Sequence, residues 1–141
     1  MSETLARTAG IKVGDTFSAR LVEDLKRTQI VQYAGSSGDY NPLHSDELFT
    51  TKVAGYPSVF AHGMLTMGMT GKLLTDTFGD GNLRKYGVRF TSQVFPGDTL
   101  DATATVTEIV DVDGEKRAKM DVKTVNQKGV EVLSGYAEGK I

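Results

Sequence analysis

Hydrophobic and polar residues alternate along the second half of the chain, from about residue 83 onward. A repeat of two is typical of strands with one buried face. Short turn sequences at 96–98, 113–114 and 126–129 separate the groups, which predicts four strands in an antiparallel meander. The apolar groups are Val88, Phe90 and Val94; Leu100, Ala102, Ala104 and Val106; Ala118, Met120 and Val122; and Val130 and Val132.

The first half follows a different pattern. Residues 23–34 and 46–53 are predicted as helices, and the Gly-, Ser- and Asn-containing stretch 35–42 between them as a loop. A weaker alternating segment at 17–22 predicts a further strand at one side of the sheet.

The segment 62–78 predicts a long helix that is apolar on more than one face. One set of residues repeats at spacings of three and four, and a second set covers another side. Such a helix is normally enclosed, so we expect an α+β fold in which the sheet wraps around it; an ordinary core helix of an α+β domain is the alternative. The two sets are Met64, Met67, Gly71, Leu74 and Phe78, and Leu65, Met69 and Leu73.

Length and composition narrow the class of protein. The 141 residues are expected to form one domain, 1–141. The net charge of −2, without a basic stripe, argues against nucleic-acid binding. There is no cysteine, no apolar run of about 20 residues that could span a bilayer, and no apolar stretch at the N-terminus typical of a signal peptide. A cytoplasmic protein without membrane contact is predicted.

The candidate acid–base residues lie in the loop. His44 follows Asp39 by five residues, and Gly38 and Pro42 restrict the backbone around them. A stiff loop can hold two titratable side chains at one small volume, as proton transfer requires. The alternative is that Asp39 and Asn41 are turn or cap residues and that His44 is a surface residue.

A second candidate is the start of the long helix. The first N–H groups of a helix have no partner within it and lie at the positive end of its dipole, so Gly63 could offer a bare N–H to a polarised carbonyl. The alternative is that His62 and Gly63 only begin the helix.

Other chemistries have weaker support. Asp39, His44, Asp46 and His62 could bind a metal by residue type, but they match no known ligand spacing. The chain contains no Gly-x-Ser-x-Gly elbow and no glycine-rich nucleotide fingerprint.

The segments 37–46, 54–57 and 61–65 resemble the signature of the MaoC-like, or hydratase 2, branch of hot-dog proteins, and 88–90 and 94–98 match it more loosely. Within this family the resemblance is to (R)-specific enoyl-CoA hydratases and to the catalytic subunit of mycobacterial (3R)-hydroxyacyl-ACP dehydratases. It implies a hot-dog fold and a hydro-lyase that adds water reversibly to trans-2-enoyl thioesters.

The resemblance also assigns roles. It implies that Asp39 and His44 are catalytic, that Asn41 orients them, and that the Gly63 N–H binds the thioester carbonyl. The stretch between His44 and His62 is one residue longer than is typical, and we place the extra residue within 50–53. By resemblance the acyl chain lies beside helix residues such as Met67, Gly71 and Leu74.

The resemblance implies neither a cofactor nor a metal. The expected partners are an acyl-CoA or acyl-carrier-protein thioester and a second hot-dog chain, in a homodimer or a heterodimer. Arg84, Lys85 and Arg89 could contact CoA phosphates or an acidic carrier, or could be ordinary surface charges. Two alternative functions stay open: an acyl-thioester hydrolase on the same fold, and a non-catalytic hot-dog partner subunit.

Overall fold

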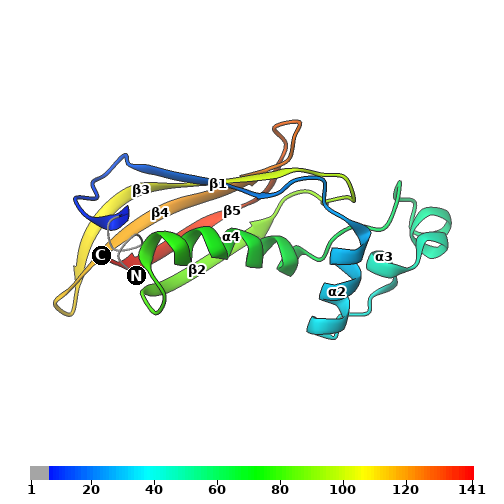
Figure 1. The fold of residues 1–141 in the computed structure, drawn as a ribbon, viewed down its shortest axis with the longest axis horizontal. Coiled ribbons are helices and arrows are strands. Elements are labelled where there is room, and N and C mark those ends of the chain that lie inside the picture. Colours follow the sequence, from blue (N-terminus) through cyan, green and yellow to red (C-terminus); the bar gives the residue numbers. More distant parts are fainter. Residues whose placement is uncertain (1–6) are drawn as a thin grey trace.

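Five antiparallel strands form one sheet that curves along the central helix α4 (Figure 1). In the computed structural model, which describes residues 7–141, the strand order is β1-β3-β4-β5-β2. The predicted α+β class is therefore confirmed. The strands are β1 (Thr16–Val22), β2 (Leu83–Phe90), β3 (Leu100–Val112), β4 (Glu115–Val125) and β5 (Glu131–Lys140).

The meander comprises three strands, not the four predicted. β3, β4 and β5 are neighbours in sequence and in space, but β2 pairs with β5 instead of β3. The turn at 96–98 therefore ends a segment that crosses from the edge strand β2 to β3, which lies next to the opposite edge. Val94, predicted as part of the first strand of the meander, lies in this crossing segment and is buried there.

Helix α4 (Gly63–Phe78) matches the predicted range to within one residue. Leu73, Leu74 and Phe78 are at most 2% exposed and pack on the middle strands. The sheet presents Ala102 and Ala104 toward this cluster. Small side chains at these positions let the helix lie close to the strands.

The sheet does not enclose α4 on every side. Met64, Gly68, Lys72 and Asp76 form an exposed stripe at spacings of four residues. The buried side of the helix is partly polar, because Thr70 shares a hydrogen bond of 2.7 Å with Thr124 across the core. The prediction that Met64 is enclosed was therefore wrong for the described chain. The apolar pattern also did not indicate that the buried face of α4 contains threonines.

Three short helices gather beyond one end of the sheet (Figure 1). They are α2 (Arg27–Ser37), α3 (Pro42–Ser45) and the π-helical turn η1 (Phe49–Val53). Helix α2 begins later than the predicted residue 23, because the chain is still turning at Asp24, with φ +56°, and the backbone of Leu25 is hydrogen-bonded to the turn before β3.

The predicted helix 46–53 is observed as a π-type turn over most of its length. The Ala54 N–H donates to the carbonyl of Phe49, five residues back, at 3.0 Å. A π turn contains one residue more than an α turn. The family resemblance placed the one extra residue of this chain in the same stretch, within 50–53.

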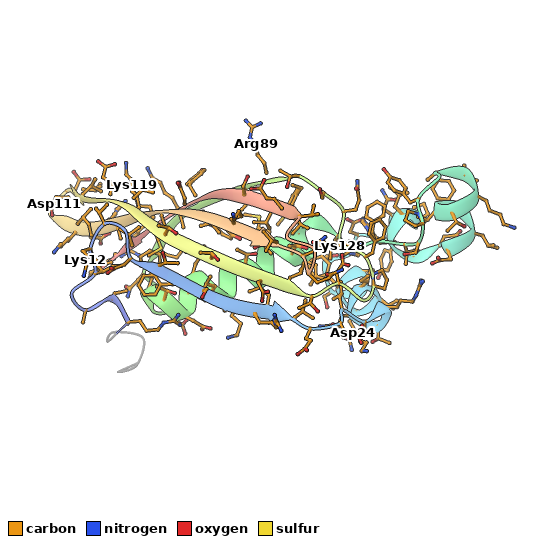
Figure 2. All side chains as sticks on the ribbon, turned by 90° about the horizontal axis from the view of Figure 1, so that it is seen from above. Lys12, Asp24, Arg89, Asp111, Lys119 and Lys128 are labelled. Carbon is orange, nitrogen blue, oxygen red and sulfur yellow. The ribbon has the colours of Figure 1, made fainter. Side chains whose placement is uncertain are left out.

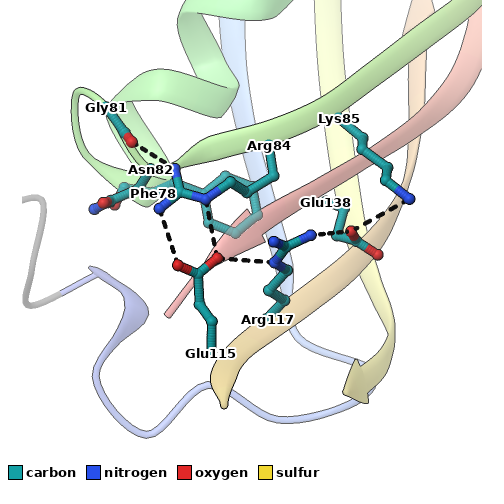
Figure 3. A network of polar contacts seen from close by, with 8 residues as sticks. All are labelled: Phe78, Gly81, Asn82, Arg84, Lys85, Glu115, Arg117 and Glu138. Atoms are coloured by element: carbon teal, nitrogen blue, oxygen red, sulfur yellow. Dashed lines mark hydrogen bonds and ion pairs between the residues drawn. The ribbon is translucent and has the colours of Figure 1, made fainter. Parts of the chain in front are cut away.

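The opposite end of the sheet is held by a network of ion pairs (Figure 3). Arg117 lies between Glu115 and the buried Glu138, with N–O distances of 2.8 and 2.9 Å, and Arg84 donates to Glu115 from β2. The two arginines hold the pKa of Glu115 down at about 2. The network therefore joins β2, β4 and β5 far from α2 and α3.

Within residues 7–141, none of the helices combines the length and the apolar character needed to cross a membrane. Residues 1–6 of the expected domain, and with them most of the stretch used to argue against a signal peptide, lie outside the described residues.

Candidate active site

The Asp39 loop begins where α2 ends. Gly38 adopts φ +74° and donates its N–H to Ala34, so the helix stops in a left-handed residue that favours glycine. The backbone N–H of Asp39 then donates to Ser37, and the Asp39 carboxylate accepts from the N–H of Asn41, both at 3.2 Å. These local bonds fix the direction of the Asp39 side chain.

His44 is carried by the short helix α3. The Asn41 side chain caps this helix by accepting from the Leu43 N–H at 3.0 Å, and Pro42 occupies the first position. The His44 Nδ1 lies 2.6 Å from the carbonyl oxygen of Phe60. Since a carbonyl only accepts, Nδ1 carries a proton, and in the neutral form of the ring the lone pair lies on Nε2.

The segment that leads into α4 is held from two sides. The Phe60 N–H donates to Leu43 of α3 at 3.2 Å, and the Ala61 N–H donates to Val94 of the crossing segment at 2.7 Å. Ala61 and Val94 also belong to the buried cluster at this end of the sheet. The start of α4 is therefore fixed relative to both α3 and the sheet.

His62 lies between the predicted candidates, and the sequence interpretation treated it as a helix start or as a metal ligand with little support, without a part in the reaction. Its ring is 2% exposed and stacks on the ring of His44, with centroids 3.8 Å apart and an angle of 24° between planes. Its Nε2 lies 3.0 Å from the backbone carbonyl of Asp39. The available signal was that His62 is the only other histidine of the chain and directly precedes Gly63.

Asp39, His44 and His62 bring their side-chain ligand atoms within 4.8 Å of one another, while Asp46 caps the next turn by accepting from Phe49. Imidazole binds a metal through a lone pair in its ring plane, at about 2.0–2.1 Å for zinc. Two nearly parallel stacked rings do not direct their lone pairs at one point. The stacking therefore favours a proton-transfer arrangement over shared ligation of one ion.

Gly63 is the first residue of α4 and lines a cavity of about 230 Å³. A Cβ at this position would meet the ring of Phe90 at 3.0 Å, so glycine leaves the start of the helix open to close approach. Thr66 and Ser92 also line the cavity. The N–H groups of the first helical turn lie at the positive end of the helix dipole, which suits a developing oxyanion.

The three residues proposed for the acyl pocket do not line this cavity. Leu74 is fully buried in the core, and the ring of Tyr86 occupies the space next to Gly71, 3.3 Å from where a Cβ would be. The Tyr86 hydroxyl donates to the carbonyl of Met67 at 2.7 Å. Burial raises the pKa of this hydroxyl to about 12, so it remains a donor at neutral pH.

The three basic residues of β2 have different surroundings. Arg84 is paired with Glu115, and Lys85 lies 3.9 Å from Glu138. Arg89 projects away from the strand (Figure 2), with no ion pair among residues 7–141. Arg84 therefore has a structural role, and Arg89 is the one of the three that is free to meet a charged partner.

Comparison with known families shows to which family the chain belongs. The family model described as the MaoC like domain matches residues 8–128, which include every element from β1 to β4. The chain belongs to the MaoC-like family. The predicted resemblance is thereby confirmed.

Individual relatives agree with this assignment. The chain is 33% identical to "(R)-specific enoyl-CoA hydratase" of Rhodospirillum rubrum over 122 residues, 85% of this chain and 82% of the relative. It is 45% identical over 75 residues to "3-hydroxyacyl-thioester dehydratase Y" of Mycobacterium tuberculosis, 51% of this chain and 26% of that protein. The match thus spans about a quarter of the length of that relative.

The solved structures confirm the hot-dog fold. The (R)-hydratase from A. caviae involved in PHA biosynthesis superimposes with a TM-score of 0.79 at 26% identity, over 93% of this chain and 97% of that one. The unliganded R-hydratase PhaJ1 from Pseudomonas aeruginosa gives a TM-score of 0.77 at 26% identity, over 93% of this chain and 82% of that one.

Proposed function

We propose that the chain catalyses the reversible hydration of trans-2-enoyl thioesters to (R)-3-hydroxyacyl thioesters. The observation that carries the proposal is the meeting of the Asp39 carboxylate and the His44 imidazole beside the start of α4, within a MaoC-like chain. The names of the relatives, which include an enoyl-CoA hydratase and a hydroxyacyl-thioester dehydratase, support the reaction class.

In the proposed mechanism, water is held between Asp39 and the Nε2 of His44. Its oxygen adds to C3 of the enoyl thioester as one of its protons passes to the pair, and a proton from the pair goes to C2. Negative charge develops on the thioester oxygen during this step, and the Gly63 N–H is placed to stabilise it. Asn41 acts indirectly, because its cap on α3 holds His44. The pair gains one proton from water and gives one to C2, so it ends unchanged and the reaction consumes only water.

A thioester hydrolase is less well supported. In a hot-dog hydrolase we expect a carboxylate on or near the central helix. The first acid of α4 here is Asp76, in the last turn of the helix, where it is exposed and paired with Lys72 at 2.6 Å. A non-catalytic partner role is also disfavoured, since Asp39 and His44 are both present and adjacent.

Incubation with crotonyl-CoA distinguishes these functions. Hydration removes the enoyl absorbance without releasing a thiol, whereas hydrolysis releases free CoA that a thiol reagent detects. We expect the first result. Thiol release at the rate of substrate loss would replace the proposal with the hydrolase, and no reaction with either CoA or carrier-protein thioesters would favour a non-catalytic subunit.

We propose that the acyl chain lies along α4 near Met67, Gly71 and Leu74, and that the Tyr86 ring limits how far it extends there. Tyr86→Ala removes the ring that occupies the space beside Gly71. The expected result is a shift of kcat/KM toward longer enoyl-CoA substrates by about tenfold, or about 1.4 kcal/mol, at the lower end of the range of roughly 1–3 kcal/mol that one methylene contributes in an apolar pocket. An unchanged preference across substrates of four to twelve carbons would place the chain elsewhere.

The expected hot-dog partner also remains a prediction. β2 is an edge strand, and Phe90 at its end is 51% exposed, which leaves a surface that a second copy or a related chain could cover. A mass of twice that of the chain in light scattering would support a homodimer, and a monomer would favour a heterologous partner.

A further inference from the structure

We infer that His62 is a positioning residue that holds the Asp39 loop, the His44 ring and the start of α4 in one geometry. The inference rests on the proposed hydratase function, because it assigns to His62 a task in that reaction. His62 contacts both members of the catalytic pair and directly precedes Gly63 in the chain.

The first contact fixes the Asp39 loop. The backbone oxygen of Asp39 lies 3.0 Å from the Nε2 of His62 and can only accept, so Nε2 carries the proton. This hydrogen bond joins the loop after α2 to the residue that caps α4, 23 positions later in the chain. The carboxylate of Asp39 is thereby held at a set distance from the Gly63 N–H.

The second contact fixes the plane of the His44 ring. His62 stacks on one side of it at 3.8 Å, and Phe60 meets it edge-on at 5.4 Å with an angle of 85°. Together with the Nδ1 bond to the Phe60 carbonyl, these contacts leave the His44 Nε2 one direction in which to point. Tyr33 of α2 packs against His62 at 4.9 Å and supports it from behind.

The remaining nitrogen of His62 argues against a role in packing alone. Nδ1 is buried and has no hydrogen-bond partner among the described residues. A buried polar atom without a partner destabilises a fold, so an apolar ring would serve a purely structural position better. His62 also contacts three other titratable residues, which are Tyr33, Asp39 and His44.

Three substitutions separate the two contacts. His62→Phe keeps a ring under His44 and removes the donor to Asp39, and His62→Gln keeps an amide donor near the Nε2 position without the ring. His62→Asn, the matched control for Gln, is too short to reach the Asp39 carbonyl. With crotonyl-CoA we expect kcat to fall by about 10²-fold in the Asn variant, with smaller losses in Gln and Phe. KM should change by less than about threefold in all of them.

A second measurement does not depend on activity. The chain has only two histidines, so imidazole ¹⁵N spectra of the wild type resolve each ring. We expect His62 as the Nε2–H tautomer and His44 as the Nδ1–H tautomer, and we expect His44 to lose its single tautomer in His62→Asn. These spectra are informative even if the wild type does not hydrate crotonyl-CoA, in which case the proposed function fails but the positioning contacts can still be judged.

Three results would overturn the inference. The first is wild-type kcat in all three variants, each shown to be folded by circular dichroism. The second is the Nδ1–H tautomer of His62 in the wild type, which is decisive even if a variant fails to fold. The third is a fall in kcat accompanied by a rise in KM of similar size, which would show general damage to binding.

Discussion

Asp39→Asn and His44→Asn each lower kcat for crotonyl-CoA hydration by about 10²–10⁴-fold, the usual contribution of a positioned acid or base. Both changes preserve the local structure. Asparagine at 39 still accepts from the Asn41 N–H, and asparagine at 44 places an amide donor near the Nδ1 position that meets Phe60. The loss therefore measures proton transfer, and initial rates of decrease in enoyl absorbance give its size.

Asp46→Asn is the matched control for the change at Asp39. Asp46 is also an exposed loop acid whose carboxylate accepts from a backbone N–H two to three residues on, but it lies outside the cluster formed with His44 and His62. It should keep wild-type activity. Full activity in Asp39→Asn and His44→Asn would remove both residues from the mechanism.

The meeting of Asp39 and His44 could be predicted because its signal is local. Gly38, Asp39, Asn41 and Pro42 restrict one another over a few residues, and the segment in which they occur matches a family signature. The structure shows the same local bonds that such residues form in any stiff loop, among them the Asn41 cap of α3. The geometry of such a short motif is set by hydrogen bonds between its own residues.

The contacts that the sequence did not reveal are long-range. His62 meets Asp39 across 23 positions, and nothing in either neighbourhood specifies the pairing. Tyr86 covers Gly71 for a similar reason: glycine in a helix indicates a close approach but does not identify what approaches. The pairing of β2 with β5 was missed because the turn at 96–98 has the composition of a hairpin whichever strands it joins.

Gly63→Pro is expected to lower kcat by about 10²–10³-fold relative to Gly63→Ala, the cost of losing one oxyanion donor. Proline lacks the N–H, yet it is favoured at the first position of a helix. The preceding His62 has φ −60° and ψ 137°, an extended conformation that proline accepts in its neighbour. The substitution therefore removes the donor and leaves α4 able to form.

Gly63→Ala supplies the control for the added side chain. Both variants carry a Cβ that meets the Phe90 ring at 3.0 Å, and Phe90 is 51% exposed and free to shift, so this steric cost is shared. Only proline loses the N–H. The comparison requires that both variants unfold at temperatures within a few degrees of the wild type. Equal kcat in the two would show that another group stabilises the thioester oxygen, and would leave Gly63 with the single task of keeping the mouth of the cavity open.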